Sequence, residues 1–277
     1  MKHFIFVISS LFILSSCSRS DIMFSFADNI IVSKTDDFFD LTRQQKKELH
    51  QHLDTDLARI RKESLPTIVK SLREIEAHTR QEKIEAPWVA QKFEEFQTQS
   101  KSLTLEFQKT AVQLSLSLQP EQFNHLEKEM REEIHKTEKE NRDPSDSDRK
   151  NFKRYQNGLE MWFGGLSKDQ KEKVKNFSTT HPFPWKLQNA NREFVLTQFL
   201  ESKKDPEKIK AFVSLFFQDY EAVRLPAYKK AVDANKIAFR TFLMETFWPS
   251  LNETQKKNLS KNLLARADEL EKLSQRP

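Results

Sequence analysis

The chain has 277 residues, a formal net charge of +5 and a charged fraction of 31%, with only three glycines and one cysteine. The basic excess is small and spread among many acidic residues, so we expect no nucleic-acid partner. Glycine supplies the positive φ angles of tight hairpins and phosphate-binding loops, and its scarcity argues against a β-rich or nucleotide-loop fold. Abundant Lys, Glu, Gln and Leu favour long helices instead.

The N-terminal residues have the pattern of an export signal. Lys2 and His3 form a short basic start, an apolar run covers residues 4–14, and Ser15 and Ser16 precede the only cysteine. Because a membrane-spanning helix needs about 20 apolar residues, this run is too short to span a bilayer. A basic start, a short apolar stretch and small residues before a cut are typical of a cleaved signal peptide.

The end of this run resembles the lipobox of bacterial lipoproteins, in which an aliphatic residue and two small residues precede an acylated cysteine. The resemblance implies cleavage between Ser16 and Cys17 and lipid attachment to Cys17. Residues 1–16 would then be the signal peptide and 17–35 the lipid-anchored N-terminal segment. Ser18, rather than Asp, implies sorting to the outer membrane, facing the periplasm. The alternative is an ordinary signal peptide followed by an unmodified cysteine.

Apolar residues recur at helical spacing along the rest of the chain, which predicts an all-α bundle of amphipathic helices over residues 36–277. The first pattern runs from Leu49 to Ile75 and should kink or restart at Leu65-Pro66. One long helix is predicted from near Pro87 to Leu114. A third pattern follows over residues 126–134.

Residues 135–151 contain no large apolar side chain, and Asp143-Pro144 should interrupt the helix there. A boundary between two halves near 141–150 and a plain surface loop are both compatible with this composition. Beyond it, Gly164-Gly165 should end one helix, and residues 181–185 read as an extended connector. Further helices are predicted near 187–202, 206–222, 226–248 and 259–270.

One helix-start pattern occurs four times: Leu, a polar residue, two variable positions and Gln. A polar cap that accepts a backbone N–H, with Gln reaching back from three residues on, is a capping box, and the Leu acts as a hydrophobic staple. Four well-started helices would explain the pattern without any further role, although its repetition hints at two loosely related halves. The residues are Leu41, Thr42 and Gln45; Leu118 and Gln122; Leu166, Ser167 and Gln170; and Leu251, Asn252 and Gln255.

This pattern resembles the Leu-Thr-x-x-Gln motif of Spy and CpxP, small helical periplasmic chaperones that bind unfolded clients without ATP. A wider set of segments resembles an uncharacterised family of bacterial lipoproteins, known only as a domain of unknown function. The resemblance implies a helical body and an acylated cysteine, and it brings no activity. The segments are 36–45, Glu63-Ser64-Leu65-Pro66, 162–166 and 225–235.

No pattern in the sequence predicts a catalytic, metal or cofactor site. Glu132 and His135 have the spacing used in di-iron bundles, but such a site needs a second pair and further carboxylates. His50 with Asp54, and His125 with Glu129, more simply decorate exposed helix faces. The glycines form no phosphate-binding pattern and no nucleophile elbow.

The sequence therefore predicts a lipid-anchored envelope protein without catalytic activity, which binds envelope components or unfolded proteins. Its 23 phenylalanines against three tyrosines favour a packed interior, and some could line a groove for an apolar client or lipid. An envelope hydrolase acting on cell wall or lipid is one alternative, and it would require His50, His78, His125, His135 and nearby acids to converge in one cleft. A structural spacer is the other.

Overall fold

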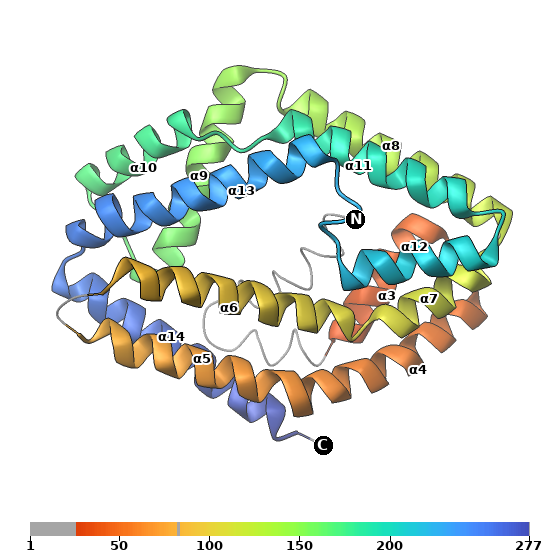
Figure 1. Cartoon of the computed structure of the whole chain (residues 1–277), viewed down its shortest axis with the longest axis horizontal. Coiled ribbons are helices and arrows are strands. Elements are labelled where there is room, and N and C mark those ends of the chain that lie inside the picture. The colour runs from red at the N-terminus through yellow and green to blue at the C-terminus, as the bar shows by residue number, and fades with distance from the viewer. Residues whose placement is uncertain (1–25, 82–83, 277) are drawn as a thin grey trace.

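The computed structural model describes residues 26–81 and 84–276, which form helices and no strands (Figure 1). The predicted all-α fold is confirmed, and Ser16 and Cys17 lie outside the described residues. Within the described part, no helix combines the length and the apolarity needed to cross a bilayer. The helices are α3 (Ala27–Phe39), α4 (Arg43–Arg59), α5 (Leu65–Thr79), α6 (Ala86–Leu105), α7 (Gln108–Ser117), α8 (Pro120–Glu140), α9 (Pro144–Phe163), α10 (Lys168–Thr180), α11 (Trp185–Ser202), α12 (Pro206–Gln218), α13 (Pro226–Thr241) and α14 (Glu253–Ser274).

Proline marks the first turn of many of these helices. α5, α6, α8, α9, α12 and α13 each carry proline at the first or second position. In those that begin after a loop, which excludes α5, the amide N–H groups of the first turn have no intrahelical partner, so a proline there removes no hydrogen bond. The break predicted at Asp143-Pro144 is confirmed: α8 ends at Glu140, and the Asp143 carboxylate caps α9 by accepting the N–H of Ser145 at 2.8 Å.

The predicted restart at Leu65-Pro66 is also confirmed. α4 passes into α5 through a π-helical turn over Ile60–Ser64, in which the N–H of Leu65 bonds to the carbonyl of Ile60. Pro66 has no N–H to continue the α-helical ladder, and a wider turn before it accommodates the loss. The helix therefore continues through the turn with its hydrogen-bond pattern interrupted.

The single long helix predicted from Pro87 to Leu114 is wrong, because the chain breaks into α6 and α7 at Glu106 and Phe107. Neither proline nor glycine causes this break. The guanidinium of Arg59 on α4 bonds to the Glu106 side chain, and its Nη2 donates to the Glu106 carbonyl at 3.2 Å. Phe107 turns into the core, where it is only 4% exposed. Tertiary contacts therefore end α6.

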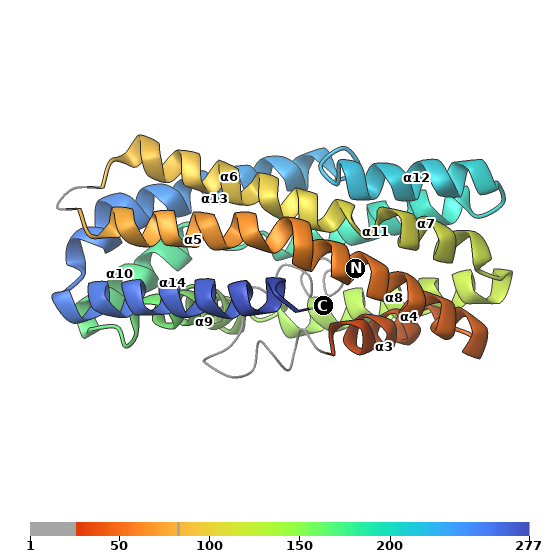
Figure 2. The same cartoon turned by 90° about the horizontal axis from the view of Figure 1, so that it is seen from below.

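The buried apolar side chains form two clusters. The N-terminal core is built chiefly by α3, α4, α7, α8, α11 and α12, and the C-terminal core by α9, α10, the start of α14 and a π-helical turn over Phe242–Phe247. Leu72 of α5 packs against both clusters, and α14 contributes Leu263 to the second and Leu270 to the first. α5 and α14 lie side by side (Figure 2) and join the two halves into one body.

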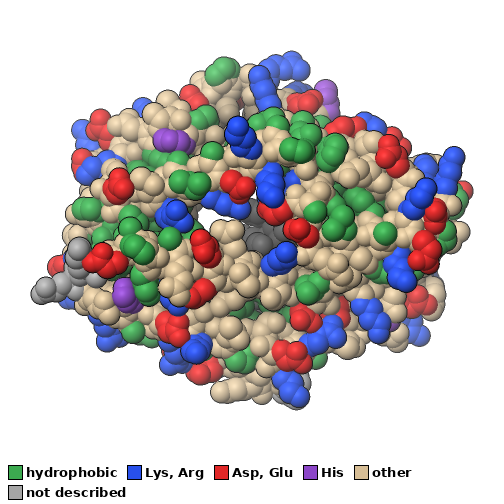
Figure 3. Space-filling view, viewed as in Figure 1, with side chains coloured by type: hydrophobic (Ala, Val, Ile, Leu, Met, Phe, Trp, Pro, Cys, Tyr) green, Lys and Arg blue, Asp and Glu red, His purple; other side chains and the backbone are tan. Residues whose placement is uncertain are grey.

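Viewed along its shortest axis, the molecule is hollowed near its middle, between α6 and α13 (Figures 1 and 3). Charged side chains of both signs stand around this opening in the space-filling view. Figure 2 shows that α6, α12 and α13 occupy one face of the molecule, and α3, α9 and α14 the other. Because the rim is charged, this opening does not match the apolar groove that the phenylalanine content could form.

Candidate functional site

The repeated helix starts meet in pairs, and the first pair joins α4 to α8. Gln45 and Gln122 are both buried and exchange amide hydrogen bonds, with Nε2 to Oε1 distances of 3.0 and 2.9 Å. Each Oε1 also accepts the N–H of its own cap residue, Thr42 at 2.9 Å and Gln119 at 3.0 Å. Each glutamine therefore supports its own helix start and contacts the partner glutamine at the same time.

The same amides reach the loop before the partner helix. Gln45 Nε2 donates to the carbonyl of Ser117 at 2.9 Å, and Gln122 Nε2 donates to the carbonyl of Asp40 at 3.0 Å. Each accepted carbonyl lies two residues before the cap of the partner helix. Buried backbone carbonyls need such partners, so the two glutamines satisfy groups that the loops leave unpaired.

The second pair, Gln170 of α10 and Gln255 of α14, repeats this arrangement. Their amides exchange hydrogen bonds of 2.9 and 2.8 Å. Each Oε1 accepts the N–H of its own cap, Ser167 at 3.0 Å and Asn252 at 3.2 Å. Each Nε2 donates to the carbonyl two residues before the partner cap, at 2.8 Å for Gln170 and 3.0 Å for Gln255. Each half of the chain therefore contains its own copy of the same hydrogen-bonded arrangement.

The motif residues are internal supports. The leucines before the caps are all buried, and so are the four glutamines. The hydrogen bonds above use each glutamine's amide donors and acceptor on protein groups. The four glutamine side chains therefore serve the fold itself. The buried leucines are Leu41, Leu118, Leu166 and Leu251.

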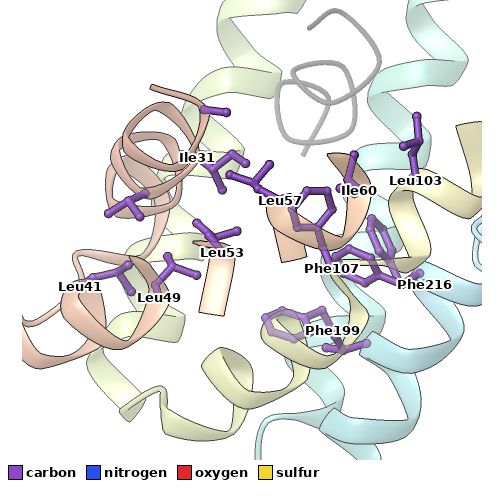
Figure 4. Close-up of a cluster of buried hydrophobic side chains, with 14 of the residues drawn as sticks. Ile31, Leu41, Leu49, Leu53, Leu57, Ile60, Leu103, Phe107, Phe199 and Phe216 are labelled. Atoms are coloured by element: carbon purple, nitrogen blue, oxygen red, sulfur yellow. The ribbon is translucent and has the colours of Figure 1, made fainter. Parts of the chain in front are cut away.

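A cavity of about 130 Å³, partly open to the surface, is lined by residues of the N-terminal core. Figure 4 shows four side chains turned toward one interior space: Leu49 and Leu53 of α4, Phe107 just before α7, and Phe199 of α11. Nearly all of its wall is aliphatic or aromatic. The lining residues are Lys34, Thr35, Phe38, Phe39, Leu49, Leu53, Phe107, Thr110, Ala111, Leu114, Ser115, Leu126, Met130, Phe199, Phe212, Val213, Phe216 and Phe217.

The threonine hydroxyls in this wall are engaged by the protein. Thr35 donates to the carbonyl of Ile31 at 2.7 Å, and Thr110 donates to the Asp56 carboxylate at 2.5 Å. Arg59 donates to the other oxygen of Asp56 at 2.6 Å. Burial raises the pKa of Asp56, and the hydrogen bonds from Thr110 and Arg59 oppose that rise without cancelling it. This network fixes α7 against α4 behind the cavity.

Lys34 is the only charged residue in the wall. Its ammonium pairs with Asp37 at 2.8 Å, and both side chains are about half exposed, at 46% and 54%. The charge therefore lies in solvent while the aliphatic stem covers apolar surface, as long basic side chains commonly do. The wall offers a ligand apolar contacts inside and one cation at its edge.

The cavity suits binding better than catalysis. A cavity of about 150 Å³ lined by Leu, Ile and Phe stays dry and takes up benzene or xenon, and this one is close to it in size and lining. Its wall contains no histidine or carboxylate, the groups that most often transfer protons. What it can do chemically is bury a small apolar group.

The histidines of the hydrolase alternative are dispersed. His50 lies 3.0 Å from a carboxylate of α3, and His125 lies 3.3 Å from a backbone carbonyl of α3. His78 stacks on an indole of α6 at 3.7 Å, and His135 is exposed on α8. Among residues 26–81 and 84–276, no group of three or more His, Cys, Asp or Glu side chains is arranged to hold a metal ion.

Sequence reasoning missed the residues that create the cavity. Thr110, Ala111 and Ser115 are small residues on the face of α7 that lines the cavity. Their small size matters only because the fold surrounds them with large aromatic side chains from other helices. A comparison of the residues just before each repeated Leu would have found one of them, since Ser115 stands three residues before Leu118.

Comparison with known proteins gives one family. The chain has no significant match among curated proteins or among solved structures. Residues 37–229 match DUF6279, a family of unknown function. The matched stretch begins within α3 and ends within α13, so it contains the first glutamine pair and most of the cavity wall. Because it covers well over half of the sequence, the chain belongs to the family of unknown function DUF6279.

Proposed function

We propose that this protein is a lipid-anchored component of the cell envelope, on the periplasmic face of the outer membrane, which binds apolar parts of unfolded proteins or other envelope components without catalysing a reaction. The resemblance of residues 14–17 to a lipobox supports the location. The observation that carries the binding function is the apolar cavity between α3, α4, α7 and α12.

The apolar lining of this cavity supports a role in binding, because its walls offer almost no polar surface to a bound group. A ligand that fills the space restores the dispersion contacts that its walls lack. That gain is available to any apolar group of the right size, as a protein that binds many clients requires.

The binding function is tested with client proteins. The processed protein, purified from membranes in mild detergent, should slow the aggregation of a chemically unfolded client when present at near-stoichiometric amounts. Light scattering gives the rate, and the same detergent without protein is the control. A structural spacer would leave the rate unchanged for every client, and that result would remove the proposal.

The anchor is tested separately. Cells fed radiolabelled palmitate should incorporate label into the wild-type chain and not into Cys17→Ser. A Ser18→Ala variant, which keeps the cysteine, serves as the matched control and should remain labelled. Equal labelling of wild type and Cys17→Ser would contradict the lipid anchor while leaving the binding assay interpretable.

A further inference from the structure

The two halves can be compared residue by residue just before their second helix start. Ser117 and Ser250 are equivalent, because each lies two residues before a cap and gives its carbonyl to the glutamine of the partner helix. Each serine hydroxyl also donates to the carbonyl three residues earlier, that of Leu114 at 2.8 Å and that of Phe247 at 2.6 Å. Leu114 in the first half therefore corresponds to Phe247 in the second.

The side chains at these equivalent positions differ in size. Phe247 is fully buried, and its ring lies 5.3 Å from that of Phe163 and 6.1 Å from that of Phe242, centroid to centroid. Leu114 lines the cavity in the N-terminal core. The residue after each position differs likewise, with Ser115 in the first half and Trp248 in the second. The equivalent chain position therefore carries an aromatic ring in one half and a leucine at the cavity in the other.

We propose that the cavity binds a single phenyl-sized aromatic ring, the group that Phe247 supplies internally in the second half. The volume of about 130 Å³ agrees with this, since a cavity of about 150 Å³ accommodates benzene. Phe107, Phe199 and Phe216 in the wall can contact an inserted ring through the tilted and edge-on geometries that aromatic pairs prefer. The inference rests on the proposed binding function and specifies the group that is bound.

The ring can be a phenylalanine side chain of a bound polypeptide or part of a free aromatic molecule. Both present the same group to the wall. Both would be favoured over a charged or strongly polar group, because nearly all of the wall is apolar and the hydroxyls of Thr35 and Thr110 already have partners. A ligand polar group would have to stay at the edge, near the ammonium of Lys34.

Benzene is the direct probe. Isothermal titration of the processed wild-type protein in detergent should show saturable binding of one benzene per chain, together with a higher melting temperature. Leu114→Phe places the chain's own ring in the cavity, as in the second half, and should weaken benzene binding at least tenfold. Leu116→Phe makes the same change on the same helix at a residue that is 44% exposed and outside the wall, and should bind like wild type.

A truncation in the second half makes the test reciprocal. Phe247→Ala should open a cavity in the C-terminal core, so that the variant binds two benzene molecules where the wild type binds one. Absence of benzene binding to the wild type, or unchanged binding to a folded Leu114→Phe, would overturn the inference. Leu114→Phe conserves apolar character and needs only local repacking, so the decisive comparison does not depend on the more disruptive Phe247→Ala.

Peptides separate the two sources of the ring. A short capped peptide with one phenylalanine should compete with benzene, and its alanine counterpart should not; competition by neither would assign the cavity to a free aromatic molecule. The outcomes also separate this inference from the proposed function. Suppressed client aggregation without benzene binding would leave the function and remove the ring pocket, whereas benzene binding without client protection would do the opposite.

Discussion

The first glutamine pair makes a quantitative prediction about the stability of the N-terminal core. In Gln45→Leu, the N–H of Thr42 and the carbonyl of Ser117 lose their partners, and so does the amide of Gln122. Four hydrogen bonds of 3.0 Å or shorter disappear, two of them shared with Gln122. At about 1 kcal/mol of net stability for each bond, the free energy of unfolding should fall by about 3–4 kcal/mol. Gln122→Leu should lose a similar amount.

The double variant Gln45→Leu/Gln122→Leu distinguishes a coupled pair from two separate caps. The two reciprocal amide bonds are counted in both single variants but exist only once. The double variant should therefore fall short of the sum of the singles by about 2 kcal/mol. Gln45→Leu combined with Gln170→Leu, which belongs to the other pair, should be additive within about 0.5 kcal/mol.

Urea unfolding followed by circular dichroism measures these differences, with the slopes of the transitions compared to verify that the variants unfold alike. A double variant of the first pair whose loss equals the sum of its singles would refute the coupling. It would mean that each glutamine acts only as a local cap, and that the hydrogen bonds between the two glutamines add nothing to the free energy of unfolding.

Two further predictions concern single residues. Gly164→Ala should cost about 1–2 kcal/mol, because Gly164 has a φ of +78° and an added Cβ would lie 2.6 Å from the Asn258 amide nitrogen. The control Gly165→Ala should be nearly neutral, since nothing lies within 4 Å of the added atom. Equal losses of stability in thermal unfolding would contradict the reasoning. Burial raises the folded-state pKa of Asp56 above its ordinary 3.8, so the charged carboxylate opposes folding at a pH above the folded-state pKa. As the pH falls from neutral to about 4 the carboxylate becomes protonated, and wild type should gain stability relative to Asp56→Asn in urea titrations. A stability difference that does not change with pH would contradict this.

Features set by neighbouring residues were predictable from the sequence. The capping box acts between residues three apart, so Thr42 with Gln45, and Ser167 with Gln170, could be recognised without a fold. The same holds for prolines in first turns and for Gly164, whose N–H bonds to the carbonyl of Glu160 where α9 ends. Each of these depends on backbone chemistry within one or two helical turns.

Features set by distant residues were not predictable. Nothing near Glu106 signals the end of α6, because the group that engages it, the Arg59 guanidinium, lies 47 positions away in sequence. Nor does any local pattern indicate that Gln45 meets Gln122, since the motif reads the same whether or not a partner exists. The repetition hinted at two related halves, and only the fold shows which starts pair.

The glutamine hydrogen bonds are nearly the same in the two halves, whereas the apolar side chains packed beside them differ. The supports are nearly the same in both, because a buried amide without a partner is costly and leaves little freedom to vary. The filling can vary, since Leu114 and Phe247 are both apolar and satisfy the same pattern. The two halves therefore keep the same hydrogen-bonded helix starts and differ in the apolar side chains that pack beside them.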